Sequence, residues 1–208
     1  MLKRIRISGY KSIKDVSVEL QPLSVFFGPN GAGKSNFLDA LQLLSKIGTS
    51  RTLKDAFEPP YRGKPLESFA FGSEGIRGLL KNESLRFTIE ADVELSPVVV
   101  GAVNRQIREM KRTFSNEKSF RGPEKVSKKL PTVREKNLRY RIELEILPKS
   151  GILRVADEYL AALNTRGEPT GKRKPFLSKS NKEKRLHLRM EGQAHPTYYE
   201  RYLDHSIL

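Results

Sequence analysis

The segment Gly28–Ser35 constrains this chain more than any other part of its sequence. It reads Gly-Pro-Asn-Gly-Ala-Gly-Lys-Ser and fits the pattern G-x-x-x-x-G-K-[ST] at every fixed position. Glycines in such a loop let successive backbone N–H groups turn inward around an anion. The helix that follows points its partially positive N-terminus at the same place. The sequence therefore predicts a phosphate-binding loop.

The residues on both sides of the loop have the periodicity that such a site requires. Residues 23–27 are almost all apolar, which predicts a short strand buried on both faces. After Lys34, apolar residues recur at three- and four-residue spacing as far as Ile47, which predicts an amphipathic helix capped by Gly48. An ordinary glycine-rich turn is the alternative, and the strand–loop–helix order argues against it.

A loop of this kind binds a nucleoside triphosphate, and ATP with Mg²⁺ is the ligand that we expect. Lys34 would reach the β- and γ-phosphates, because its ammonium group follows the last glycine of the loop. The hydroxyl of Ser35 would ligate the magnesium ion.

Positive charge is the second informative property of the sequence. The chain of 208 residues has 39 basic and 24 acidic residues and a net charge of +15. Residues 101–140 carry +8 and residues 164–190 carry +7, so these two basic segments account for the excess. Such a field attracts polyanions, which predicts DNA as a partner of the basic segments. A solvated basic face, or one covered by another part of the protein, is the alternative.

Composition also excludes several classes of function. The chain has no cysteine, which excludes disulfides, zinc knuckles and thiol catalysis. No run approaches the about 18–20 apolar residues that span a membrane, so we expect no membrane partner. The N-terminus alternates charged and apolar residues, unlike a signal peptide, and we expect a cytoplasmic protein. His187, His195 and His205 do not have the spacing of metal ligands.

The rest of the chain has the pattern of an antiparallel sheet with one long helix. Residues 49–83 are rich in Gly and Pro and predict a long loop with short helical pieces. Ser96-Pro97 predicts the start of a helix, and residues 115–137 predict a polar, basic, mobile insertion. Alternating apolar residues predict strands at 2–9, 13–20, 85–95, 138–146 and 153–161, and a last hairpin at 176–190.

Residues 3–16 read Lys-Arg-Ile-Arg-Ile-Ser-Gly-Tyr-Lys-Ser-Ile-Lys-Asp-Val. They resemble the opening of the SMC/RecF-type branch of ABC ATPases, in which a strand, an aromatic-Lys-Ser turn and a second strand precede the P-loop. The resemblance continues through Gly-Pro-Asn-Gly-Ala-Gly-Lys-Ser-Asn at 28–36 and Phe-Leu-Asp-Ala-Leu at 37–41. The start is also similar to the ATPase part of OLD-type nucleases and related bacterial AAA/ABC-like ATPases. The specific resemblance covers about residues 1–47.

The resemblance implies an α/β fold, namely the first lobe of a P-loop NTPase of the ABC/SMC-head type. It implies an antiparallel β-subdomain and a basic helical insertion. We expect one partial ATPase domain over 1–208. Its strand pair, P-loop and first helix would occupy 1–48, and its β-subdomain 84–190 with the basic insertion at 97–137.

The resemblance also assigns residues to the nucleotide. Tyr10, Lys11 and Ser12 would lie near the base or ribose. The residues expected to bind the nucleotide are Gly28, Pro29, Asn30, Gly31, Ala32, Gly33, Lys34, Ser35 and Asn36, and Ser35 would also bind magnesium.

Hydrolysis in this branch requires a Walker B strand and a signature loop from a second head, and neither is evident. Ile152–Glu158 ends in Asp-Glu, but Arg154 interrupts its apolar run. A charge in a strand buried on both faces is costly, so we interpret Asp157 and Glu158 as ordinary strand carboxylates. Gln193 is the candidate for the Q-loop glutamine. The catalytic residues stay unknown, and we expect a second ATPase head or a missing second lobe as a partner.

These observations predict the ATP-binding lobe of an SMC/RecF/OLD-like ATPase that couples ATP to work on DNA, such as repair or phage defence. A P-loop kinase is one alternative, and the early strand pair argues against it. A transporter-type ABC subunit is another. A basic nucleic-acid-binding module with a non-hydrolysing P-loop is the third.

Overall fold

The computed structural model describes residues 1–59, 61–70, 75–118, 132–171, 174–179, 185–189, 195–200 and 202–208. For residues 76 and 110–118 it describes the backbone alone. Gln193 and residues 119–131 of the expected insertion lie outside the described residues.

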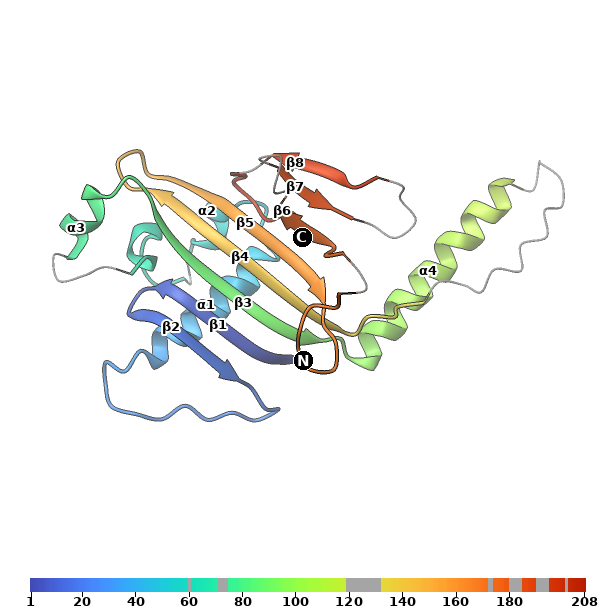
Figure 1. Cartoon of the computed structure of the whole chain (residues 1–208), viewed down its shortest axis with the longest axis horizontal. Coiled ribbons are helices and arrows are strands. Elements are labelled where there is room, and N and C mark those ends of the chain that lie inside the picture. Colours follow the sequence, from blue (N-terminus) through green and yellow to red (C-terminus); the bar gives the residue numbers. More distant parts are fainter. Residues whose placement is uncertain are drawn as a thin grey trace.

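Within the described residues, eight strands form one sheet in the order β2-β1-β3-β4-β5-β6-β7-β8, and every neighbouring pair in it is antiparallel (Figure 1). β1 pairs with β3, so the N-terminal strand pair and the later strands belong to the same sheet. Sequence alternation predicted the first five strands and the last hairpin, but not β8. The strands are β1 (Leu2–Tyr10), β2 (Ile13–Glu19), β3 (Leu85–Glu94), β4 (Asn137–Leu147), β5 (Ile152–Ala162), β6 (Leu177–Lys179), β7 (Arg185–Leu188) and β8 (Thr197–Glu200).

The helices are few. α1 (Lys34–Ile47) ends at Gly48, as its sequence predicts, and short helical pieces follow in the expected loop. These pieces are α2 (Leu53–Ala56), the 3₁₀ helix η1 (Pro65–Ser68) and α3 (Gly75–Lys81). α4 (Pro97–Lys118) begins after Ser96 and continues four residues into the stretch that was expected to be a mobile insertion. It connects β3 with β4 and projects away from the sheet (Figure 1).

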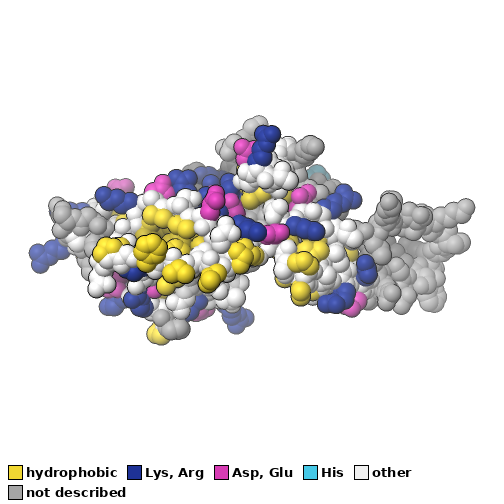
Figure 2. Space-filling model, turned by 90° about the horizontal axis from the view of Figure 1, so that it is seen from below, with side chains coloured by type: hydrophobic (Ala, Val, Ile, Leu, Met, Phe, Trp, Pro, Cys, Tyr) yellow, Lys and Arg dark blue, Asp and Glu magenta, His cyan; other side chains and the backbone are white. Residues whose placement is uncertain are grey.

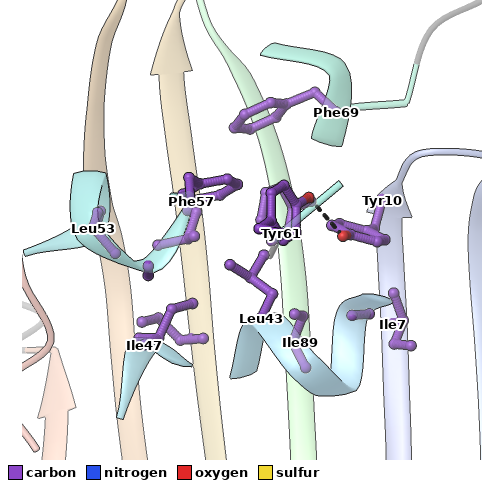
Figure 3. Close-up of a cluster of buried hydrophobic side chains, with 14 of the residues drawn as sticks. Ile7, Tyr10, Leu43, Ile47, Leu53, Phe57, Tyr61, Phe69 and Ile89 are labelled. Carbon is purple, nitrogen blue, oxygen red and sulfur yellow. Dashed lines mark hydrogen bonds between the residues drawn. The ribbon is translucent and has the colours of Figure 1, made fainter. Parts of the chain in front are cut away.

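One face of the sheet packs on α1 and α2 and forms the core. Apolar side chains of β1, β3 and β4 contact the apolar stripe of α1 and the aromatic residues of the following loop (Figure 3). Tyr10 and Phe69 each lie about 5 Å, between ring centroids, from Phe87. The labelled core residues in Figure 3 are Ile7, Tyr10, Leu43, Ile47, Leu53, Phe57, Tyr61, Phe69 and Ile89.

The opposite face of the sheet carries charged residues in ion pairs across the strands. Arg4 bonds with Glu90 and Asp92, and Arg139 also bonds with Asp92, at 2.6 Å. Burial raises the pKa of Asp92, but the hydrogen bonds from Arg139 and Arg4 outweigh it and the pKa lies below its ordinary value. Further pairs join Arg6 to Asp15, Arg141 to Asp157, Arg86 to Glu143 and Glu145, and Arg154 to Glu145. Alternation in these strands therefore separates an apolar face from a face of paired charges.

The strand expected at residues 23–27 is absent, and that prediction is wrong. No residue of this segment pairs with a strand among the described residues, and Leu23, Val25 and Phe27 are 81%, 76% and 92% exposed. Phe26 instead packs on Phe37 of α1, with ring centroids 4.8 Å apart. A strand forms only beside a partner strand, and the described sheet ends at β2 without pairing with this segment. Figure 2 shows hydrophobic side chains gathered on the side of the molecule where this segment lies in Figure 1.

The C-terminal segment 203–208 is hydrogen-bonded to both β5 and α2. The backbone N–H of Val155 donates to the carbonyl of Leu203, and the N–H of Leu53 donates to the carbonyl of Asp204, both at 2.7 Å. The carboxylate of Glu158, which is 0% exposed, accepts from the Ile207 N–H at 2.8 Å. The hydroxyls of Ser206 and Tyr140 donate to the same carboxylate. Glu158 therefore holds this segment on the sheet.

No helix in the described part of the chain combines the length and hydrophobicity of a membrane-spanning segment.

Removal of the Glu158 carboxylate tests this attachment. Glu158→Ala leaves the Ile207 N–H without its acceptor and removes one of the two partners of the Tyr140 hydroxyl, so we expect the free energy of unfolding to fall by about 1–3 kcal/mol. Urea denaturation measures the loss, and amide exchange at Leu53 and Val155 should accelerate. Glu200→Ala, at an exposed position of β8, is the control. Equal urea midpoints for the two variants would show that Glu158 does not anchor the segment.

Candidate nucleotide-binding site

The glycine loop has the backbone conformation that its sequence demands. Gly31 and Gly33 have φ of 82° and 90°, in the left-handed region that favours glycine. Gly33 caps α1, and the N–H of Phe37 donates to its carbonyl at 2.9 Å. Residues 28–32 are exposed, and the first turn of α1 contains no acidic residue. The partial positive charge at the start of α1 therefore faces an accessible loop.

Lys34 and Ser35 stand at this helix start. The ammonium of Lys34 turns back over the loop and donates to the carbonyls of Gly28 and Pro29 at 2.7 and 2.8 Å. A phosphate can replace these two carbonyl contacts, because an anion is a stronger partner for an ammonium than a neutral carbonyl. The Ser35 side chain is exposed one residue further on. Its hydroxyl suits one position of a magnesium shell, in which phosphate and water oxygens supply most ligands.

The β1–β2 turn lies directly against the loop. Asn36 donates from Nδ2 to the Ser12 hydroxyl at 2.8 Å, and a Cβ built on Gly33 would lie 3.3 Å from that hydroxyl. Tyr10 does not fit the expected place near the base or ribose, because its side chain is fully buried and hydrogen-bonds with Tyr61 at 2.7 Å. Burial and this hydrogen bond raise the pKa of Tyr10. The turn therefore contacts the helix start, with Tyr10 pointing into the core.

An ion cluster that the sequence did not reveal joins this turn to α1. The carboxylate of Asp39, in the second turn of α1, accepts from Lys11 at 2.8 Å and from Arg62 at 2.7 Å. Burial raises the pKa of Asp39, but the hydrogen bonds from Arg62 and Lys11 lower it below its ordinary value. One signal was available: Asp39 precedes Leu43 by four residues, so helical spacing places it on the buried stripe.

The other candidates lie away from the loop. Asp157 faces the charged side of the sheet and pairs with Arg141, whereas Glu158 faces the core and holds the C-terminal segment. β3 and β4 separate β5 from β1, so these carboxylates are not beside the P-loop, in agreement with their interpretation as strand carboxylates. Among the described residues, no three His, Asp or Glu side chains form a group that could hold a metal ion.

A glycine loop with a lysine and a serine at the start of a packed helix defines the class of P-loop proteins. The comparison with protein families agrees: the family model AAA_15, the AAA ATPase domain, matches residues 1–185. The chain therefore belongs to this ATPase family and is an SMC/RecF/OLD-like ATPase lobe.

Curated relatives support the same placement. The chain is 28% identical over 105 residues to the DNA replication and repair protein RecF of Renibacterium salmoninarum, covering 50% of this chain and 24% of RecF. It is 41% identical over 44 residues to the OLD nuclease of Thermus scotoductus, with coverages of 21% and 8%. It is 40% identical over 78 residues to the chromosome partition protein Smc of Desulfitobacterium hafniense, with coverages of 36% and 6%. The chain thus spans at most about a quarter of these relatives.

The loop conformation makes a stability prediction. Gly33→Ala forces a Cβ into the left-handed region and against Ser12, so we expect the free energy of unfolding to fall by about 2 kcal/mol, measured by urea denaturation. Gly48→Ala is the control, because φ of Gly48 is −72° and the added Cβ makes only ordinary contacts. A Gly33→Ala protein as stable as the control would contradict the left-handed conformation.

Proposed function

We propose that this chain is the ATP-binding lobe of a RecF/Smc/OLD-like ATPase whose ATP binding and hydrolysis accompany work on DNA. The observation that carries the proposal is the glycine loop with Lys34 at the start of α1, in a chain that belongs to the ATPase family. Relatives named for DNA replication and repair and for chromosome partition favour a role of that kind. Phage defence stays a prediction.

Different groups of the loop would contact the phosphates and the magnesium ion. Backbone N–H groups of residues 30–35 at the N-terminus of α1 would surround the phosphates. Lys34 would leave the two carbonyls that it contacts and bind the β- and γ-phosphates. Ser35 would hold the magnesium ion, which supplies positive charge to the phosphates when it is bound. Asp39 does not compete for that ion, since Lys11 and Arg62 occupy its carboxylate.

A second lobe or second head would complete hydrolysis. The apolar side chains of Leu23, Val25 and Phe27 alternate along the segment that leads into the loop, and all three face solvent. A contiguous exposed apolar surface beside a ligand loop is typical of an interface. A partner at this place would lie next to the phosphates, where the missing hydrolytic groups are needed.

The arm formed by α4 is the proposed DNA contact. On the charged face of the sheet the arginines are paired with carboxylates, so their charges are largely compensated. Arg105 and Arg108 are exposed on α4, within the segment that carries +8. Phosphate contacts from such an arm would be independent of sequence and sensitive to salt.

ATP binding by the purified chain tests the first part of the proposal. Lys34→Ala removes the ammonium that would contact the phosphates, so we expect ATP affinity in the presence of Mg²⁺ to fall about 30-fold or more, measured by calorimetry. Lys14→Ala removes the same charge at an exposed position of β2 and should bind as the wild type does. Equal affinities for the two variants would refute a nucleotide site at the loop. ATP binding with turnover of a nucleoside or sugar would instead favour a kinase.

Salt-dependent DNA binding tests the second part. Removing two cations with Arg105→Gln/Arg108→Gln should weaken binding to duplex DNA of any sequence and reduce the slope of log affinity against log salt by about 2. Fluorescence anisotropy at several salt concentrations measures both quantities. Arg6→Gln/Lys14→Gln removes two cations from the first two strands and serves as the matched control. If the control loses as much affinity as the arm variant, the arm is not the contact.

A further inference from the structure

The ion cluster of Lys11, Asp39 and Arg62 attaches the helix that follows the P-loop to two other segments of the chain. Asp39 is a buried acid on the face of α1 that contacts the sheet, and its side chain is 9% exposed. It receives Lys11 from the β1–β2 turn and Arg62 from the loop between α2 and η1. Three segments that are distant in the sequence therefore meet at one carboxylate in the second turn of the P-loop helix.

Lys11 is held in an unusual conformation to make this contact. Its φ is 48°, in the left-handed region that non-glycine residues rarely adopt. Its N–H donates to the Ser68 carbonyl at 2.9 Å, and its ammonium donates to the Arg62 carbonyl at 3.0 Å. The ammonium also lies 4.9 Å from the centre of the Tyr61 ring. A conformational cost of this kind persists only where surrounding contacts determine it.

The same turn reaches the glycine loop itself. The residue after Lys11 is Ser12, whose hydroxyl accepts from Asn36 and lies beside Gly33. The Lys11–Asp39 bond and the Ser12–Asn36 bond are thus two parallel attachments between one turn and the first two turns of α1. Two attachments fix the rotation of a helix about its axis as well as its position, which one attachment cannot do.

We propose that Asp39 is a positioning residue for the nucleotide: it does not contact the phosphates, but holds the start of α1 in the orientation that the loop needs. This inference rests on the proposed ATP site. Lys11 is only 12% exposed at its side chain, whereas Arg62 is 60% exposed. Loss of the Asp39 carboxylate therefore leaves the nearly buried ammonium of Lys11 without an opposite charge. Loss of Arg62 costs less, because this side chain is largely exposed and Lys11 still pairs with Asp39.

ATP affinity and amide exchange of the 208-residue chain test the proposal together. For Asp39→Asn we expect ATP–Mg²⁺ affinity to fall roughly tenfold, because small displacements of binding groups are costly. Exchange in a peptide covering residues 33–40 should accelerate. Arg62→Met should change both quantities about twofold or less. Glu19→Gln, which removes an exposed carboxylate from β2, is the control with the same change of charge.

A double variant separates positioning from stability. Lys11→Met/Asp39→Asn removes both buried charges, so its urea midpoint should recover above that of Asp39→Asn. Its ATP affinity should stay as low as that of Asp39→Asn, since the attachment is still missing. A purely structural role predicts that affinity recovers with the midpoint, and that result would overturn the proposal.

If the proposed ATP site is wrong, the same measurements give a different set of results. If Lys34→Ala binds ATP as the wild type does, the nucleotide site is not at the loop. The inference about Asp39 then falls with the site on which it rests, and faster exchange at residues 33–40 in Asp39→Asn would show only that the carboxylate stabilises the start of α1. If Lys34→Ala loses binding but Asp39→Asn keeps wild-type affinity and exchange, only the positioning role is refuted.

Discussion

The packing of α1 on one face of the antiparallel sheet is the interaction on which the rest of the structure depends. Its apolar stripe is buried against β1, β3 and β4, while its N-terminus stays in contact with solvent. The burial holds the helix in place, and the open end keeps its unpaired N–H groups available to an anion. A fully covered α1 would have no site, and an unpacked α1 would have no fixed loop.

Much of this arrangement could be predicted from the sequence, because local patterns determine it. Alternation predicted β1 to β5, and helical spacing with Gly48 predicted both ends of α1. The strand predicted at 23–27 does not form. An apolar composition shows that a segment favours burial, but it does not show whether another element is available to cover it. Asp39 was missed because its partners, Lys11 and Arg62, lie 28 and 23 residues away in the sequence. Ion pairs between residues so far apart produce no periodic pattern in the sequence. The attachment of Glu158 to residues 203–208 could not be predicted for the same reason.

Ion pairing changes what the net charge of this protein says about its surface. Arginines on the sheet meet carboxylates on neighbouring strands, so the large net charge does not describe that face. The exposed arginines of α4 belong to a basic segment with few acids. Net charge alone would suggest binding to polyanions over the whole surface. Ion pairing on the sheet directs the expected contact to the basic segments, to one of which α4 belongs.

α4 is a long arm that leaves the sheet between β3 and β4. A 22-residue helix is about 33 Å long. Its base is the connection between two strands that run side by side through ten registered residue pairs, near the middle of the sheet. The arm and the glycine loop therefore belong to elements that are anchored on the same sheet.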